Sequence, residues 1–162
     1  ADLLALRARL GVRSTAHLAA RLLEPFDGDC VRMVGASDEA MLALARDYML
    51  ESGGRAILAR GAHGEAYVDP MQRPRIEYVS DGLLRVMFEA EPVRTRRMHG
   101  APESAGAAVV AAWMRRMLAG ELAVPLPLAN QLATCLFAAG YASDINQAKA
   151  IVAIETGSLV AA

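Results

Sequence analysis

The sequence predicts an α/β fold: a mixed sheet with a parallel βαβ unit and a following antiparallel hairpin, flanked by helices, with a helical C-terminal half. Three observations lead to this prediction. A periodic segment of helical length separates two short apolar runs, and an Asp-Gly dipeptide separates two more. Three periodic segments that each stop at a glycine then complete the chain.

Two short helices are expected before the sheet begins. The leucines of Asp2–Leu10 recur at helical spacing and stop at Gly11. Ser14-Thr15 is suited to cap a second helix that runs to Leu23. The Glu24-Pro25 dipeptide then ends it, because a residue before proline disfavours helical backbone.

The parallel βαβ unit comes next. Cys30–Gly35 and Arg55–Ala59 are short apolar runs typical of buried strands. Between them, Ser37-Asp38-Glu39 precedes a strongly periodic segment that closes at Gly53-Gly54. We interpret these three polar residues as a helix cap rather than as ligands. The two strands should be parallel, with a right-handed crossover.

The hairpin and the C-terminal helices follow. Arg75–Ser80 and Leu83–Ala90 flank Asp81-Gly82, a dipeptide that favours a type I′ turn. The last part of the chain is then helical, with expected helices at Glu103–Ala119, Leu126–Ala139 and Ser143–Glu155.

Length and composition favour one cytoplasmic domain. The 162 residues are 54% hydrophobic, enough for a single core. No apolar run approaches the roughly 20 residues that span a bilayer, and the N-terminus lacks the pattern of a signal peptide. Cys30 and Cys135 lie in separate apolar segments, so we expect reduced thiols rather than a disulfide or a zinc site.

Basic residues are unusual in type rather than in number. The formal net charge is −1, which gives no whole-chain signal for nucleic acid. All of the 17 basic residues except Lys149 are arginine, which binds phosphate as a bidentate fork. A GC-rich genome produces the same bias without any function. The clusters at Arg94–Arg97 and at Arg7, Arg9 and Arg13 are therefore either anion sites or solvated loops.

A loop after the second strand is the main candidate for a ligand site. Arg55–Ala59 should deliver the segment Gly61–Pro70 to one edge of the sheet, and ligands of open α/β folds bind at such an edge. Its polar residues His63, Glu65 and Asp69 show no recognised metal spacing and are equally typical of an exposed loop. No Gly-x-Ser-x-Gly elbow occurs, so no catalytic residue is assigned.

Several motifs occur together in a characteristic order along the chain. They are Leu10–His17, Leu22–Pro25, Gly61–Gly64 with Asp69-Pro70, Asp81-Gly82, Gly100–Ser104, Leu118–Glu121 and Leu136–Gly140. In this order the chain resembles the C-terminal α/β domain of the anthranilate phosphoribosyltransferase family, glycosyltransferase family 3, and most closely its YbiB-type nucleic-acid-binding paralogues. The resemblance implies that residues 1–162 are a single α/β domain, the C-terminal portion of a larger two-domain protein that forms a homodimer.

The departures from that family concern metal binding. Family enzymes hold magnesium on phosphoribosyl pyrophosphate with an Asp-Glu pair in this loop. The two equivalent positions are Ala66 and Tyr67 here. Magnesium requires hard oxygen ligands, so we expect no metal and no cofactor. The family's Gly-Thr-Gly-Gly-Asp phosphate loop would lie upstream of this chain.

Three functions remain open on this basis. By the resemblance, the first is a non-catalytic domain that binds the phosphate backbone of DNA or RNA without sequence preference, through Arg9, Arg94, Arg96 and Arg97, with Arg7 and Arg13 as further anion ligands. The runner-up is a magnesium-dependent phosphoribosyltransferase whose phosphate site lies in an N-terminal half, with Arg7 and Arg13 facing an acidic acceptor. The third is an interaction or dimerisation module. No membrane partner is expected.

Overall fold

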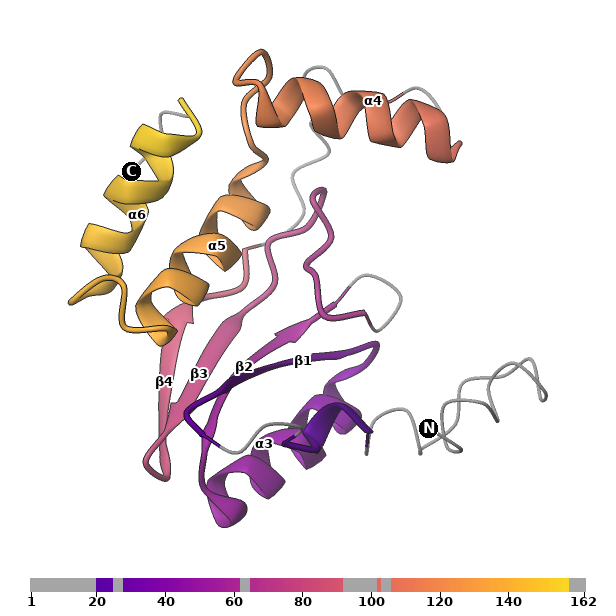
Figure 1. The fold of residues 1–162 in the computed structure, drawn as a ribbon. Coiled ribbons are helices and arrows are strands. Elements are labelled where there is room, and N and C mark those ends of the chain that lie inside the picture. Colours follow the sequence, from indigo (N-terminus) through magenta and orange to yellow (C-terminus); the bar gives the residue numbers. More distant parts are fainter. Residues whose placement is uncertain (1–19, 25–27, 62–64, 92–101, 103–105, 158–162) are drawn as a thin grey trace.

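The computed structural model describes residues 20–24, 28–61, 65–91, 102 and 106–157. These residues form a four-stranded sheet with helices on both faces (Figure 1), which confirms the predicted α/β class. Residues 20–22 are helical and Leu23, the expected last residue of the second helix, is not; residues 1–19, with the rest of the two expected N-terminal helices, lie outside the described residues. The named elements are β1 (Val31–Ala36), α3 (Glu39–Ser52), β2 (Arg55–Arg60), β3 (Ile76–Ser80), β4 (Leu83–Phe88), α4 (Ala107–Leu118), α5 (Leu126–Ala138) and α6 (Ile145–Glu155).

The sheet has the order β1-β2-β3-β4 and mixed direction. β1 and β2 are parallel, whereas β2 with β3 and β3 with β4 are antiparallel, as the sequence predicts. Because β1 and β2 run the same way, their last residues Ala36 and Arg60 are partners at one edge. The Gly61 amide donates to the Ala36 carbonyl at 3.1 Å. The loop after β2 therefore leaves at the carboxyl edge of the parallel pair, as expected.

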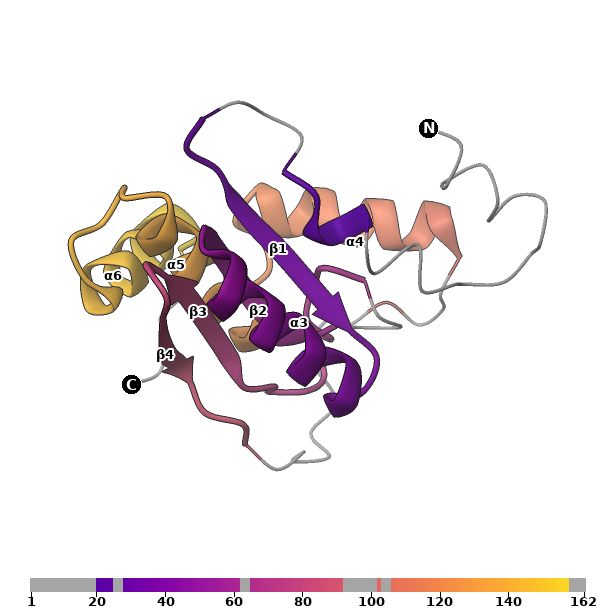
Figure 2. The same ribbon diagram turned by 90° about the horizontal axis from the view of Figure 1, so that it is seen from below.

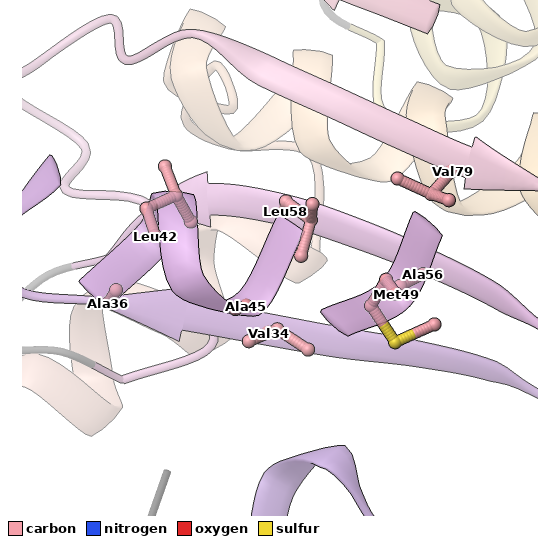
Figure 3. Close-up of a cluster of buried hydrophobic side chains, with 8 residues drawn as sticks. All are labelled: Val34, Ala36, Leu42, Ala45, Met49, Ala56, Leu58 and Val79. Atoms are coloured by element: carbon pink, nitrogen blue, oxygen red, sulfur yellow. The ribbon is translucent and has the colours of Figure 1, made fainter. Parts of the chain in front are cut away.

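Helix α3 covers one face of the sheet. Its N-cap is Asp38, whose side chain accepts a hydrogen bond from the Met41 amide at 2.9 Å, so the cap interpretation of this segment is confirmed. Leu42, Ala45 and Met49 form its buried side. Burying a side chain such as Met49 contributes about 2 kcal/mol. Figure 3 shows these residues with their partners from the sheet, which are Val34, Ala36, Ala56, Leu58 and Val79.

Helix α5 covers the opposite face (Figure 2), and α6 packs on α5. The ring of Phe137 meets Tyr78 of β3 edge to face, with ring centroids 5.7 Å apart. The Arg55 side chain, at the start of β2, donates to the Ala138 carbonyl at 3.3 Å. The C-terminal end of α5 therefore lies at the amino end of β2. This places the turn after α5 opposite the carboxyl edge.

The hairpin and helix ends follow local sequence signals. Asp81 and Gly82 have φ values of 53° and 69°, the two positive values that a type I′ turn requires. Helix α6 begins at Ile145 rather than Ser143, because Asp144 is the residue whose side chain caps it. Strand β4 ends at Phe88, two residues earlier than expected.

Helix α4 stands apart from the sheet in Figure 1. None of its residues is buried, and Leu118 is 82% exposed. Residues 103–105 of the expected helix lie outside the described residues, and the observed helix begins after Gly106. Among the described residues, no helix combines the length and apolar character needed to cross a membrane.

Candidate functional site

The loop at the carboxyl edge packs directly on the ends of β1 and β2. A Cβ atom built on Gly35 would lie 1.9 Å from the Glu65 carbonyl oxygen, and one built on Gly61 would lie 1.7 Å from the same atom. Only glycine leaves room for this backbone approach. The Glu65 carbonyl therefore occupies the space between the two strand ends.

The side chain of Gln131 in α5 fixes the same loop from the other side. Its Nε2 donates to the Ala66 carbonyl at 2.7 Å, and its Oε1 accepts from the Val68 amide at 3.1 Å. Gln131 is 6% exposed and Val68 is fully buried. One side-chain amide thus satisfies two backbone groups that would otherwise be costly to bury. The sequence indicates nothing about this role beyond a polar residue in an apolar helix.

The loop's side chains offer little to a metal ion. At the two positions where the resemblance leads us to expect acids, Ala66 has a methyl group and Tyr67 a phenol that is 50% exposed. Asp69 accepts from the Met71 amide at 2.8 Å and so serves a turn. Across the described ranges no group of three or more His, Cys, Asp or Glu side chains is arranged to hold a metal. His63 lies outside those ranges.

Arg21 joins the chain before β1 to this loop. Its Nη1 donates to the Gly35 carbonyl at 2.8 Å and its Nη2 to the Glu65 carboxylate at 3.2 Å. The side chains of Arg21 and Glu65 are only partly exposed, so this pair is more than a surface contact. An arginine therefore lies at the carboxyl edge, paired with Glu65, which precedes Tyr67 by two residues.

A second feature of this edge is a cleft of about 310 Å³ between the first turns of α3 and the segment that leads into β3. Four arginines and three glutamates line it, so its charge is weakly positive. We call it the arginine cleft, after Arg46, Arg60, Arg73 and Arg75.

Glu77 of β3 forms the floor of the arginine cleft. Its side chain is 2% exposed, and each carboxylate oxygen accepts from one guanidinium: Arg46 Nε at 2.7 Å and Arg75 Nε at 2.8 Å. The hydrogen bond that Arg46 donates to Glu77 raises the pKa of Arg46, and partial burial opposes that effect. On the solvent side, Arg46 also donates to Glu39 and Arg75 to Glu89, and both of these carboxylates are exposed.

The opposite face carries a cavity of different character. It has a volume of about 390 Å³ and is lined mostly by apolar side chains, among them Met33, Leu128 and Cys135. Its lining includes no arginine or lysine, so it does not suit phosphate. Cys30 and Cys135 are free, half-buried thiols. Burial raises the pKa of Cys135, and a hydrogen bond to Glu24 raises that of Cys30.

The structure describes few of the residues selected from the sequence. The positions of Ala66 and Tyr67 are established at the carboxyl edge. The arginine cleft was missed, although the Arg73-Pro74-Arg75 spacing at the start of a strand was a usable signal. The six arginines predicted to bind anions or nucleic acid lie outside the described residues and stay predictions: Arg7, Arg9, Arg13, Arg94, Arg96 and Arg97.

Fold and edge together define an α/β domain whose ligand edge holds a packed loop and an arginine-lined cleft. Over 150 residues the chain is 33% identical to Uncharacterized protein YbiB of Escherichia coli (strain K12). This match covers 92% of the chain and 46% of YbiB, so the chain spans about half the length of that relative. The likeness supports a YbiB-like family for this protein. No family model matches the chain.

Proposed function

We propose that this domain is a non-catalytic member of the phosphoribosyltransferase type that binds the phosphate backbone of nucleic acid without sequence preference. The observation that carries the proposal is at the carboxyl edge. There Tyr67 stands at the position of an expected metal ligand, its ring 50% exposed beside the apolar cavity that it helps to line, and Arg21 donates to Glu65 of the same loop.

The absence of catalysis is supported by how the loop is held. The backbone group that Glu65 directs at Gly35 and Gly61 is a carbonyl oxygen, not an amide N–H. Gln131 then fixes the next part of the loop by hydrogen bonds to the backbone of Ala66 and Val68. A pyrophosphate site requires amide donors and a metal with oxygen ligands. Ala66 supplies no such ligand. The loop lies at the edge where ligands of open α/β folds bind. Its exposed aromatic side chain, Tyr67, suits stacking on a base rather than binding of a metal ion.

Nucleic-acid binding is supported by the combination of ring and cations. Proteins that bind single strands use aromatic side chains for base stacking and basic side chains for the backbone. Arg60 directly precedes Gly61, which packs against the loop that carries Tyr67. The predicted Arg94–Arg97 cluster begins three residues after Glu91, which lines the arginine cleft.

The experiment is a fluorescence anisotropy titration of labelled single- and double-stranded DNA of mixed sequence at a series of salt concentrations. We expect binding at low salt that weakens steeply as salt rises. Tyr67→Ala should weaken binding to single strands about tenfold, the loss expected for one stacked base. Tyr141→Ala is the matched control, because Tyr141 is also exposed but lies in the turn after α5.

Two results would contradict the proposal. One is an absence of DNA and RNA binding at low salt. The other is magnesium-dependent consumption of phosphoribosyl pyrophosphate by the purified protein, which would instead support the transferase. Replacing Arg94, Arg96 and Arg97 together with glutamine tests the sequence prediction separately, and a loss of affinity for every DNA sequence alike is the expected result.

A further inference from the structure

The arginine cleft has an unusual internal support. Glu77 is a buried carboxylate with both oxygens occupied, one by Arg46 and one by Arg75. Each of these guanidiniums donates to Glu77 through Nε, which lies at the base of the group. Of the terminal nitrogens, Nη2 of Arg46 donates to Glu39 and Nη1 of Arg75 donates to Glu89. The carboxylate acts as an anchor that orients two cations along one wall.

Several donors of the cleft have no acceptor among the described residues. Arg60 donates only through Nε, to the Ser37 carbonyl at 3.3 Å, which leaves both of its terminal nitrogens without a described partner. Nη1 of Arg46 and Nη2 of Arg75 are in the same situation. Arg73 uses Nη1 alone, towards Glu91. The cleft thus presents more N–H donors than the surrounding acceptors use.

The acids that compete for these donors are at the surface. Glu39 is 71% exposed and Glu91 54% exposed, so their pairs with Arg46 and Arg73 are solvated and contribute little. Glu77 is the one carboxylate of the lining that is buried, and both of its oxygens are already in use. An anion that entered the cleft would displace two weak surface pairs and leave the buried anchor intact.

From these contacts we propose that the arginine cleft is a binding site for one phosphate group. Arg60 and Arg73 supply the mobile donors, and Arg46 and Arg75 form the fixed wall. Guanidinium forks match phosphate oxygens through paired hydrogen bonds. The volume of about 310 Å³ lies at the small end of ligand sites, which suits a phosphate group better than a whole cofactor.

The phosphate can come from two sources, a phosphodiester of a nucleic acid or a free phosphate ion. A phosphodiester as the ligand rests on the proposed function, and it would give the nucleic-acid backbone a defined contact on this domain. The free-ion source does not depend on it. Inorganic phosphate and an oligothymidylate without terminal phosphates are therefore the two probes.

The test compares two double variants of equal charge. Arg60→Gln with Arg73→Gln removes the mobile donors and spares both ligands of Glu77. Arg85→Gln with Arg115→Gln removes two exposed arginines that do not line the cleft. Binding is followed by calorimetry and by amide shifts in NMR spectra. Unchanged spectra outside the cleft establish that both variants are folded.

We expect the cleft pair to weaken phosphate binding at least tenfold and the control pair to weaken it less than twofold. If the oligothymidylate loses affinity in parallel, the cleft is a backbone contact. If inorganic phosphate binds but the oligothymidylate does not, the cleft proposal stands and the proposed function fails. If the oligothymidylate binds both variants equally while inorganic phosphate depends on Arg60 and Arg73, the cleft is a site for the free ion. If phosphate binding is absent or insensitive to Arg60 and Arg73, the cleft proposal is overturned.

Discussion

The loop and the arginine cleft lie at the same edge of the sheet, yet they are filled in opposite ways. The loop is closed by its own backbone, because the Glu65 carbonyl lies against Gly35 and Gly61. The side chain of Gln131 also hydrogen-bonds to the Ala66 carbonyl and the Val68 amide. The cleft is lined by charged side chains instead, and Glu77 holds two of its arginines, Arg46 and Arg75, through their Nε atoms. One edge of a sheet can therefore carry a closed loop and an open cleft side by side.

The largest expected effect comes from filling the space under the loop. Gly61→Ala puts a methyl group 1.7 Å from the Glu65 carbonyl oxygen, so backbone must move. We expect a loss of about 3 kcal/mol in the free energy of unfolding, at the upper end for overpacking. Urea unfolding followed by circular dichroism measures it.

Gly120→Ala is the control for this variant. Gly120 has a φ of 74° and nothing within 4 Å of an added Cβ, so it tests backbone strain without a clash. We expect a smaller cost of about 1 kcal/mol. Equal costs for the two variants would show that the loop does not pack on Gly61 as described.

Removing the anchor of the cleft should have the next largest effect. Glu77→Leu deletes two charge-assisted hydrogen bonds from a side chain that is 2% exposed. Its partners are 21% and 44% exposed and can turn to water, so we expect a loss of about 2 kcal/mol rather than the full cost of a broken buried pair. Thermal unfolding gives the value.

Glu121→Leu is the comparison for Glu77. The Glu121 pair with Arg116 has both side chains more than half exposed, so its loss should cost less than about 0.5 kcal/mol. A Glu77 variant as stable as the Glu121 variant would mean that the cleft has no buried anchor.

The loop's other support is expected to be weaker. Gln131→Met keeps the volume and removes both hydrogen bonds to the loop, which leaves the buried Val68 amide without its acceptor. We expect a cost of about 1.5 kcal/mol and faster hydrogen exchange at Val68. Gln147→Met, at an exposed glutamine that accepts from Ser143, should cost less. Unchanged exchange at Val68 would count against the role of Gln131.

The sequence predicted those features of the fold that depend on residues close together in the chain. The Asp81-Gly82 turn and the cap at Asp38 are local, and both were predicted from a few adjacent residues. The βαβ unit needed only periodicity. The contact of Gln131 with Ala66 and Val68 joins residues more than sixty positions apart, which no local pattern encodes.

β3 illustrates the same limit. Its Ile-Glu-Tyr-Val-Ser sequence contains a glutamate that alternation would place on an exposed face, yet all five residues are buried. The reason is that Arg46, from α3, and Arg75 cover the carboxylate of Glu77. A polar residue in a strand is thus an ambiguous signal until its partner is known. Ala66 and Tyr67 were informative because a family pattern supplied the comparison.

The smallest expected effect concerns the thiols and leaves the fold intact. Hydrogen bonding to Glu24 raises the pKa of Cys30, so less thiolate is present at a given pH. Glu24→Gln removes the negative charge, and alkylation of Cys30 by iodoacetamide should then accelerate near neutral pH. Mass spectrometry measures the rate at each thiol. Cys135, whose pKa is raised by burial, should react at the same rate in both proteins.

The salt dependence of DNA binding tests the central claim most directly. The logarithm of the affinity for an oligothymidylate is plotted against the logarithm of the salt concentration for the wild type and for the two double arginine variants. We predict a negative slope for the wild type, reduced in magnitude by about 0.7 in the Arg60→Gln, Arg73→Gln protein, the value for one lost phosphate contact on a single strand. The Arg85→Gln, Arg115→Gln protein should keep the wild-type slope. Three equal slopes, or binding that salt does not weaken, would contradict a backbone contact in the arginine cleft.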